Sequence, residues 1–343
     1  MKYTAFHPGQ PWYDTDGKLI QAHGGSVFPA DGRYYWVGEN KEFTDGKNGI
    51  WTYGVRMYSS DDLYNWKDEG LALAPHPEDY TNPLHPKRIL DRPHVIYNRF
   101  TRQYVMWMKF AGDEQHPDDW SRQYMGIATA AAPTGPYTLQ KVIRPCGMES
   151  GDFDLGVDER DGKGFVIFGR VHTEVIVADL TADYLDVTGH YSAHFWNPGP
   201  PTAREAPAMF CRDQWYYLLT SGTTGYNPNP TQAARARLLH GDWHEYGEIC
   251  CGDVWRNSFA AQFASVFRVP GKKDLYIALG DRWMASLGGE EAVRFNGESP
   301  VFDSRRLDTG HAAYVWLPIR FDAAGTPRLE GRDSWSLEEF EDA

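Results

Sequence analysis

A carboxylate stands at the start of a segment that otherwise has the composition of a protein core. Glu205 follows Arg204 and precedes a small apolar run at residues 206–210, after which come a polar turn and a Tyr-Tyr strand. A charged group beside a packed interior is costly unless a partner holds it or a reaction uses it. Two interpretations are therefore open for Glu205: a structural salt bridge, for example to Arg204, and catalysis.

Polar residues stand at the same place in four other segments. Each segment continues with a short apolar strand, a polar turn and a second strand rich in aromatic residues. The segments recur at intervals of about 53 to 68 residues, and they start at His23, Asp91 (followed by Arg92), Asp152, Glu205 and Gln262. A third strand, a short turn and an aromatic residue complete most of the units. Such a repeat predicts propeller blades of four strands each.

Five copies of the unit predict an all-β fold, a five-bladed β-propeller. Helical periodicity is scarce, whereas short alternating strands and Gly, Asp or Asn turns are frequent. A β-sandwich fits less well because its strands would not recur in groups of four. We expect residues 1–343 to form one propeller without a separate carbohydrate-binding domain. Its inner strands are predicted near residues 23–28, 91–97, 152–157, 205–210 and 262–268.

The innermost strands of a propeller start at one mouth of its central channel, so the five polar positions are predicted to form a small pocket. Three of them carry carboxylates, the groups that hydrolyse glycosidic bonds. Glu205 is the natural general acid, and Asp152 is suited to raise its pKa by like-charge repulsion. Arg92 is expected to restrain Asp91 as an anion or to hold a sugar hydroxyl. The alternative is that these groups only satisfy one another and water in the channel.

Composition limits the classes of partner. The net charge is −13, from 34 basic and 47 acidic residues, which makes nucleic acid and anionic membranes poor partners and favours a carbohydrate. Aromatic residues make up 15% of the chain and suit stacking on sugars, although sheet packing explains most of them. The four cysteines form no CxxC pair, so a zinc site of that kind is not indicated, and we expect no cofactor.

Neither a run of about 18 apolar residues nor an apolar signal core near the N-terminus is present. We therefore expect no membrane association and a cytoplasmic location, or secretion if a leader segment has been removed. A monomer or a small homo-oligomer is expected.

Longer stretches resemble glycoside hydrolase family 43, and in particular its branch of exo-β-1,3-galactanases. The stretches that carry the resemblance lie between about residues 20 and 320: AHGGSVFPADGRYYWVGENKE, YSSDDLYNWKDEGLAL, DRPHVIYN, YMGIATAAAPTGPY, REAPAMF, TSGTTGYNPN, LGDRW and YVWLPI. The resemblance implies a five-bladed propeller that hydrolyses glycosides with inversion. It also implies that Glu205, in the motif Glu-Ala-Pro, is the acid and that Asp152 modulates its pKa.

That branch lacks the aspartate base that the family usually carries on the first blade. This chain likewise has His23-Gly24-Gly25 there, without a carboxylate. In the branch, a glutamine on the fifth blade is proposed to replace the base through its imidic acid form, and Gln262 stands at that place. Because an amide is a feeble base, we expect Gln262 to position the attacking water. The branch tends to carry glutamate before Arg-Pro on the second blade, where this chain has Asp91.

Further candidates for contacts with the sugar are His23, Glu39, Tyr124, Thr223 and Thr224. Glu39 is equally suited to an ion pair with Lys41 or Arg56 on a solvated edge, and Tyr124 to a core ring with its hydroxyl at the rim. His23 is expected to be structural or to contact substrate. One histidine without a cage of oxygen ligands is a poor calcium site, so no metal is predicted.

These features predict an inverting, exo-acting glycoside hydrolase that releases galactose from β-1,3-linked galactan or galacto-oligosaccharides. Inversion calls for roughly 6.5–9.5 Å between the acid and the water-holding group, and opposite sides of the mouth are expected to place Glu205 and Gln262 at that spacing. An α-L-arabinofuranosidase, a β-D-galactofuranosidase and a β-xylosidase of family 43 stay open as alternatives. The missing first-blade aspartate also leaves open a non-catalytic sugar-binding propeller, although such a protein has no need of an acid and its modulator.

Overall fold

The computed structural model describes residues 2–158, 161–284, 294–297 and 306–343. Regular structure in these residues is almost entirely β-strand. The helical segments described are single 3-10 turns, η1 (Pro145–Gly147), η5 (Thr309–His311) and η6 (Leu337–Glu339). The prediction of an all-β fold is confirmed. No helix in the described residues has the length and apolar character needed to cross a membrane.

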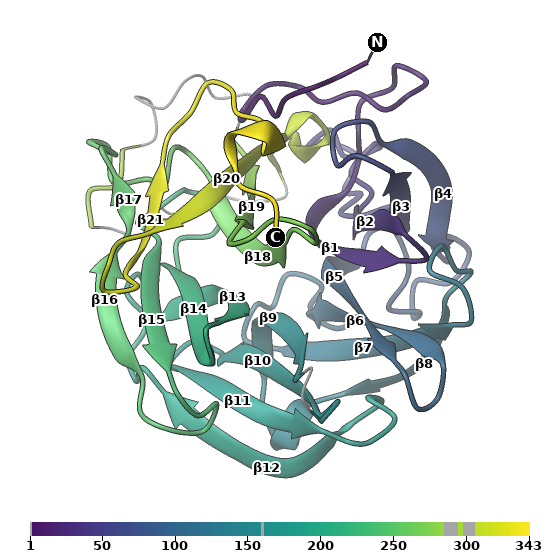
Figure 1. Ribbon diagram of the computed structural model, residues 1–343. Helices are drawn as coiled ribbons and strands as arrows, with labels where there is room; N and C mark the ends of the chain where they lie inside the picture. Colours follow the sequence, from purple (N-terminus) through teal and green to yellow (C-terminus); the bar gives the residue numbers. More distant parts are fainter. Residues whose placement is uncertain (1, 159–160, 285–293, 298–305) are drawn as a thin grey trace.

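Five sheets follow one another around a ring, from the first blade in purple to the last in yellow (Figure 1). The first four sheets are antiparallel, and each is arranged in chain order from the centre outward. Their strands are β1 (His23–Ala30), β2 (Arg33–Glu39), β3 (Val55–Ser60), β4 (Lys67–Leu73), β5 (Ile89–Asn98), β6 (Gln103–Ala111), β7 (Gln123–Ala130), β8 (Thr138–Ile143), β9 (Ser150–Val157), β10 (Gly164–Arg170), β11 (Glu174–Leu180), β12 (Val187–His194), β13 (Arg204–Arg212), β14 (Trp215–Gly222), β15 (Gln232–Ala236) and β16 (His244–Glu248). The predicted five-bladed propeller is confirmed.

The fifth blade has an additional strand. Its order is β18-β19-β20-β21-β17, and β17 pairs in parallel with β21 although it precedes the blade in sequence. The strands are β17 (Cys250–Cys251), β18 (Gln262–Arg268), β19 (Tyr276–Arg282), β20 (Ala313–Phe321) and β21 (Pro327–Glu330). The segment that leaves the fourth blade therefore also covers the outer edge of the fifth.

Apolar clusters fill the space between neighbouring blades. For example, Val37 of the first blade packs in one cluster with Met106 of the second, and Ile167 of the third blade packs with Leu218 of the fourth. Where the ring closes, Phe6 of the N-terminal segment packs on a cluster shared by the first and fifth blades, and its backbone pairs with that of Trp335. Most aromatic residues thus pack the blades together, which holds the central mouth in shape.

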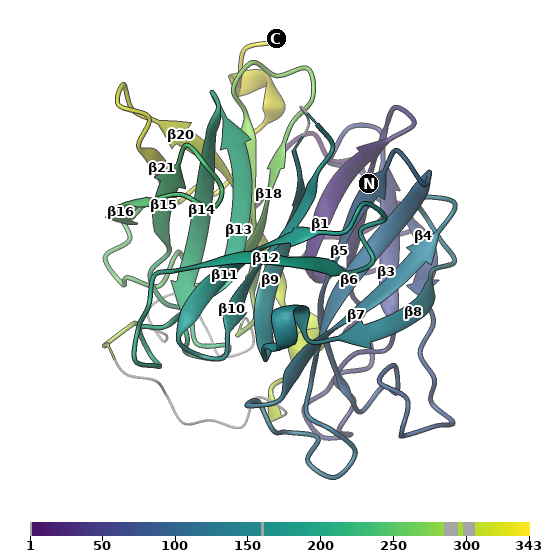
Figure 2. The ribbon, with the colours of Figure 1, turned by 90° about the horizontal axis from the view of Figure 1, so that it is seen from below.

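The inner strands β1, β5, β9, β13 and β18 run along the axis of the ring (Figure 2). In β5 and β13 the pairing with the next strand shifts just after the first polar residues, between Asp91 and His94 and between Glu205 and Ala208. In each shift a residue with positive φ precedes a proline: Arg92 at 50° and Ala206 at 47°. Such bulges bend a strand and change the direction of its side chains. They let the strand starts present polar groups to the mouth.

Candidate active site

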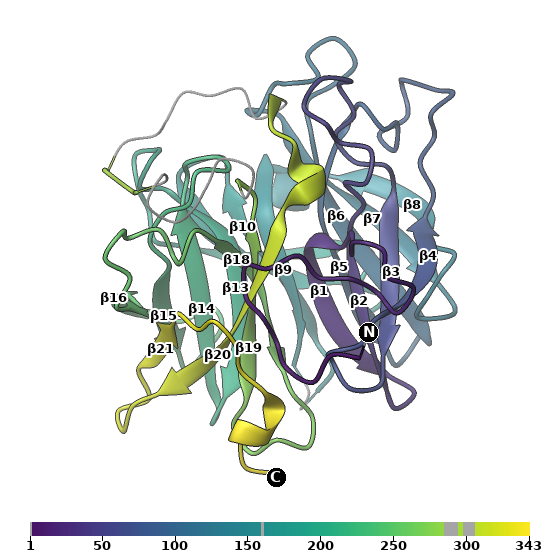
Figure 3. The same ribbon diagram turned by 90° about the horizontal axis from the view of Figure 1, so that it is seen from above.

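A cavity of about 260 Å³ lies at the mouth where the inner strands begin. The segments that join β2 to β3 and β6 to β7 leave the sheets at this same end, where Figure 3 shows long loops, whereas the C-terminus lies at the other end of the ring. Eight of the residues predicted from the sequence line the cavity: Glu39, Asp91, Arg92, Asp152, Glu205, Thr223, Thr224 and Gln262. His23 and Tyr124 are not among the residues that line it.

Two buried cations hold the carboxylate of Asp152. Arg92 Nε lies 2.9 Å and Lys109 Nζ lies 2.7 Å from Asp152 Oδ1. Burial alone would raise the pKa of Asp152, but the charges of Arg92 and Lys109 outweigh it and hold this pKa well below its usual range. Asp152 is therefore an anion throughout the neutral pH range.

Asp91 has a different cationic partner from the one expected. Lys109 Nζ lies 2.9 Å from Asp91 Oδ2, and the indole Nε1 of Trp51 donates a 2.6 Å hydrogen bond to Asp91 Oδ1. The ion pair that Arg92 makes is with Asp152. The expectation that Arg92 restrains Asp91 therefore gives way to a chain of charges in which Lys109 links the two aspartates.

Glu205 lies beside this chain of charges. Burial is the largest influence on its pKa, repulsion from the Asp152 carboxylate is the second, and together they raise it to about 8, against the smaller opposing effects of Arg92 and Lys109. Its side chain is partly exposed, and that exposed part faces the cavity. Glu205 thus keeps its proton at neutral pH, and its carboxyl can contact a ligand in the cavity. A general acid needs both properties.

Gln262 is held by three neighbours. Its Oε1 accepts a 2.6 Å hydrogen bond from Arg92, and its Nε2 donates to Ser221 Oγ at 2.9 Å and to Glu205 Oε1 at 3.2 Å. The spacing expected for these two groups is therefore wrong in this structure, because the amide and the acid touch directly. No water fits between the two hydrogen-bonded atoms.

Glu39, the last residue of β2, forms a buried ion pair. Its Oε2 lies 2.8 Å from Lys41 Nζ, and its Oε1 accepts a 2.9 Å hydrogen bond from the backbone N–H of Arg92. Both members of the pair are buried, so the solvated edge considered for Glu39 is wrong. Burial, with help from Asp91, raises the pKa of Glu39 to about 7 despite Lys41. Gly24 leaves room for this carboxylate, because a Cβ there would lie 2.5 Å from Glu39 Oε1.

The remaining candidates make contacts within the protein. His23 Nδ1 lies 3.0 Å from Asp281 Oδ1, and its ring stacks on Tyr314 at 4.9 Å between centroids. Tyr124 packs against Phe110, and its hydroxyl accepts a long hydrogen bond from Arg88.

The hydroxyls of the two threonines bind backbone carbonyls, that of Thr223 binding Ala203 and that of Thr224 binding Asn227. The roles of His23, Tyr124, Thr223 and Thr224 in contacting a sugar stay predictions.

Several cavity residues were not singled out by the sequence: Trp51, Lys109, Trp120, Gln123, His172 and Tyr226. Lys109 did carry a signal, because it is a lysine inside the apolar run YVMWMKF of a second strand, opposite Asp91 in the register. The aromatic residues Trp51, Trp120 and Tyr226 come from loops, and of these three only Tyr226 lies in a stretch that carried the resemblance, TSGTTGYNPN.

The aromatic rings form one wall of the cavity. Trp51 stacks on Tyr226 at 5.9 Å between centroids, and Tyr226 lies 4.9 Å from the ring of Trp283. Trp120 meets Trp51 edge to face at 5.5 Å. Aromatic rings beside a set of carboxylates suit a sugar, whose apolar face stacks while its hydroxyls make hydrogen bonds.

Comparison with known proteins agrees with this description. The model of the glycosyl hydrolases family 43 matches residues 22–283. The solved structure of a family-43 β-1,3-galactosidase, BT0265, is 32% identical with a TM-score of 0.82; the alignment covers 99% of this chain and 65% of that one. The chain thus spans about two thirds of that protein's length.

Two further structures are similar over nearly the whole chain. The family-43 β-1,3-galactosidase BT3683, with galactodeoxynojirimycin, is 28% identical with a TM-score of 0.81, covering 97% of this chain and all of that one. An exo-β-1,3-galactanase from Phanerochaete chrysosporium, with β-1,3-galactotriose, is 26% identical with a TM-score of 0.80, covering 99% of this chain and 70% of that one. A comparison with curated protein sequences found no match.

Proposed function

This chain belongs to the glycosyl hydrolases of family 43, and from that premise we propose that it is an inverting, exo-acting glycoside hydrolase. Its proposed reaction is the release of galactose from β-1,3-linked galactan or galacto-oligosaccharides. The observation that carries the proposal is the contrast between Glu205 and Asp152. Arg92 and Lys109 lie 2.9 Å and 2.7 Å from the Asp152 carboxylate and hold it ionised, and burial beside that charge raises the pKa of Glu205 to about 8.

The proposed chemistry begins with Glu205. Its proton passes to the glycosidic oxygen as the bond from that oxygen to the anomeric carbon breaks, and the leaving group departs as an alcohol. Asp152 keeps Glu205 protonated before this step. Arg92 and Lys109 keep Asp152 charged, so that its repulsion of an ionised Glu205 persists across the neutral pH range.

Water attacks the anomeric carbon from the face opposite Glu205, which inverts the configuration. Gln262 is the group proposed to orient this water. Arg92 donates to its carbonyl oxygen, which favours the ordinary amide form over the imidic acid form and so supports orientation more than proton transfer. Since Gln262 also donates to Glu205 at 3.2 Å, the entering sugar must break that hydrogen bond and separate the two side chains to roughly 6.5–9.5 Å before the amide can hold the water.

Cavity size and lining support an exo-acting enzyme for one terminal sugar. The volume of about 260 Å³ lies just below the roughly 300–1,000 Å³ of common small-molecule sites, which suits a single ring better than several. The choice of galactose rests on the β-1,3-galactosidases and exo-β-1,3-galactanase to which the chain is similar.

A hydrolysis panel followed by proton NMR tests the proposal. The substrates are β-1,3-galactobiose and the aryl β-galactopyranoside, α-L-arabinofuranoside, β-D-galactofuranoside and β-xyloside. Initial appearance of α-galactose from the β-linked substrates supports both the sugar and inversion, and initial β-galactose refutes inversion. Turnover of a furanoside or xyloside alone refutes galactose while keeping the acid. Galactose binding without turnover of any substrate refutes the enzyme and favours a sugar-binding propeller.

Glu205→Gln in the same panel separates the acid from other contributions. Substrates with good aryl leaving groups need little protonation, so they should lose less rate than galactobiose. An equal loss on both kinds of substrate contradicts the assignment of Glu205.

A further inference from the structure

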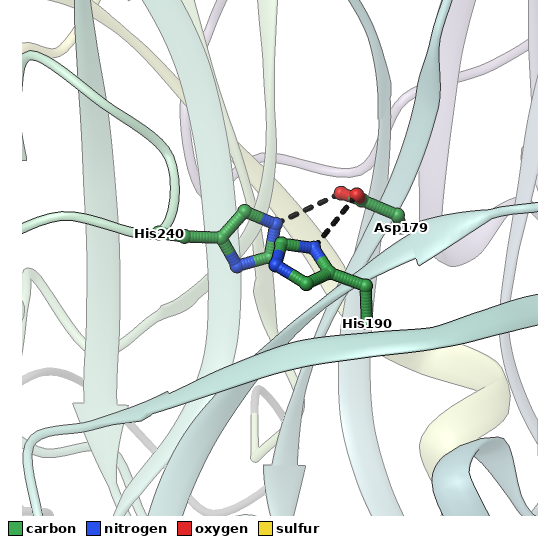
Figure 4. A group of neighbouring side chains, drawn as sticks. All are labelled: Asp179, His190 and His240. Carbon is green, nitrogen blue, oxygen red and sulfur yellow. Dashed lines mark hydrogen bonds and ion pairs between the residues drawn. The ribbon is translucent and has the colours of Figure 1, made fainter.

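Two histidines and an aspartate meet at the outer part of the third and fourth blades, away from the catalytic cavity. Asp179 is on β11 and His190 is on β12, both in the third blade, and His240 lies between β15 and β16 in the fourth. His190 Nδ1 lies 2.9 Å from Asp179 Oδ2, and His240 Nε2 lies 2.8 Å from Asp179 Oδ1. Figure 4 shows both rings turned toward the one carboxylate. None of the three residues lines the catalytic cavity.

We propose that Asp179, His190 and His240 bind a zinc ion that links the third and fourth blades. This inference is independent of the proposed hydrolase activity. Two imidazole nitrogens and one carboxylate oxygen are a common zinc ligand set, and a water can complete a tetrahedron. Calcium fits poorly because it takes six to eight oxygen ligands.

The local structure places the ligands close to binding geometry. The three ligand atoms lie within 4.8 Å of one another. In a tetrahedral site with bonds of about 2.0–2.1 Å, ligand atoms are roughly 3.3 Å apart, so side-chain movements of up to about 1.5 Å bring the two nitrogens and one carboxylate oxygen to a zinc ion. The pairing of β11 with β12 shifts between Ala178 and Leu180, so the strand irregularity is at Asp179 itself.

Ser192 supplies the outer partner that a ligating histidine needs. Its Oγ lies 2.8 Å from His240 Nδ1 and 2.7 Å from His194 Nε2. Zinc at Nε2 requires the proton of His240 to sit on Nδ1, where Ser192 Oγ can accept it. Outer hydrogen bonds of this kind orient the ring and fix its tautomer. The ligands and their support are thus both present.

If zinc cross-links the two blades, we expect it to raise the thermal stability of the protein and to leave the catalytic cavity unchanged. The two histidines are 50 positions apart and belong to different blades, so an ion bound between them restrains the movement of one blade against the next. Zinc that binds the folded chain and not the unfolded chain raises the unfolding temperature.

The test is zinc titration by calorimetry of the full chain without an affinity tag, after chelator treatment and dialysis. The variants are His190→Ala and His240→Ala, with Ser192→Ala for the outer partner. His244→Ala is the matched control, because His244 is exposed on β16 and lies outside the cluster. We expect one zinc ion per wild-type or His244→Ala chain. Affinity should fall about 10-fold in Ser192→Ala and by more than about 100-fold in the two ligand variants.

Thermal unfolding gives a second readout. Zinc should raise the midpoint of the wild type and of His244→Ala and leave that of His190→Ala unchanged. Because His190 is exposed, its replacement leaves the packing intact, and circular dichroism without zinc checks this. The absence of one saturable site in the wild type overturns the proposal. Binding that persists in both ligand variants also overturns it, because the ion then sits elsewhere.

Discussion

Replacing Glu205 with glutamine should make the protein more stable at neutral pH while abolishing most of its activity. The carboxyl has an ordinary pKa of 4.5 in the unfolded chain and about 8 in the folded protein. Between these values the folded state holds one proton more than the unfolded state, so the free energy of unfolding falls as pH rises. Each pH unit in this window costs about 1.4 kcal/mol. From pH 4.5 to pH 7 the wild type thus loses about 3 kcal/mol through this one group.

Glutamine has no proton to lose, so Glu205→Gln should escape that loss. We expect the variant to gain about 3 kcal/mol relative to the wild type between pH 4.5 and pH 7, measured by urea unfolding at several pH values. Glu114→Gln is the control, since Glu114 is exposed and does not line the cavity. Turnover of β-1,3-galactobiose by Glu205→Gln should fall by about 10²–10⁴-fold at the same time.

A constant stability difference between Glu205→Gln and the wild type across this range would refute the reasoning. It would mean that Glu205 ionises near its ordinary pKa and that the site does not hold it protonated. Loss of activity with a flat stability difference would leave Glu205 important for turnover but remove the physical basis for its role as a neutral acid.

Three other changes test the polar groups around Glu205. Asp152→Asn removes the like charge that raises the pKa of Glu205, so the basic limb of kcat/KM against pH should move to lower pH; an unmoved limb would leave Asp152 with a binding role only. Lys109→Met leaves Asp91 and Asp152 without their shared cation and should cost about 3–5 kcal/mol in urea unfolding, with partial rescue by Lys109→Arg; unchanged stability would show that the pairing contributes nothing. Gln262→Ala should lower kcat severely while galactose binding, followed by calorimetry, survives in part; an unchanged kcat removes Gln262 from the mechanism.

Much of the architecture and the pocket could be predicted from the sequence because both follow from a repeated local pattern. Alternating strands, turns and a polar residue before each unit are local features, and they identified the inner strands and the mouth to which Asp91, Glu205 and Gln262 contribute. The Glu-Ala-Pro motif marked Glu205, the proposed acid, for a related reason. Its residue of positive φ and its proline set the local bend that presents the carboxyl to the cavity.

The partners of those residues were decided by the tertiary structure. Arg92 and Gln262 are 170 residues apart, and only closure of the ring brings their side chains to 2.6 Å. Lys109 pairs with both Asp91 and Asp152 because the second and third blades meet at the mouth, and the contact between Gln262 and Glu205 likewise spans two blades.

The proposed zinc ligands likewise could not be predicted from the sequence. The spacing of His190 and His240 in the chain matches no metal-binding motif. The Asp179 carboxylate contacts both rings only after the third and fourth blades pack together. The sequence repeat predicts the strands and turns of each blade, because hydrophobic periodicity and turn residues act over a few positions. Ion pairs and metal ligands act over a few ångströms, and those distances exist only once the five blades have closed into a ring.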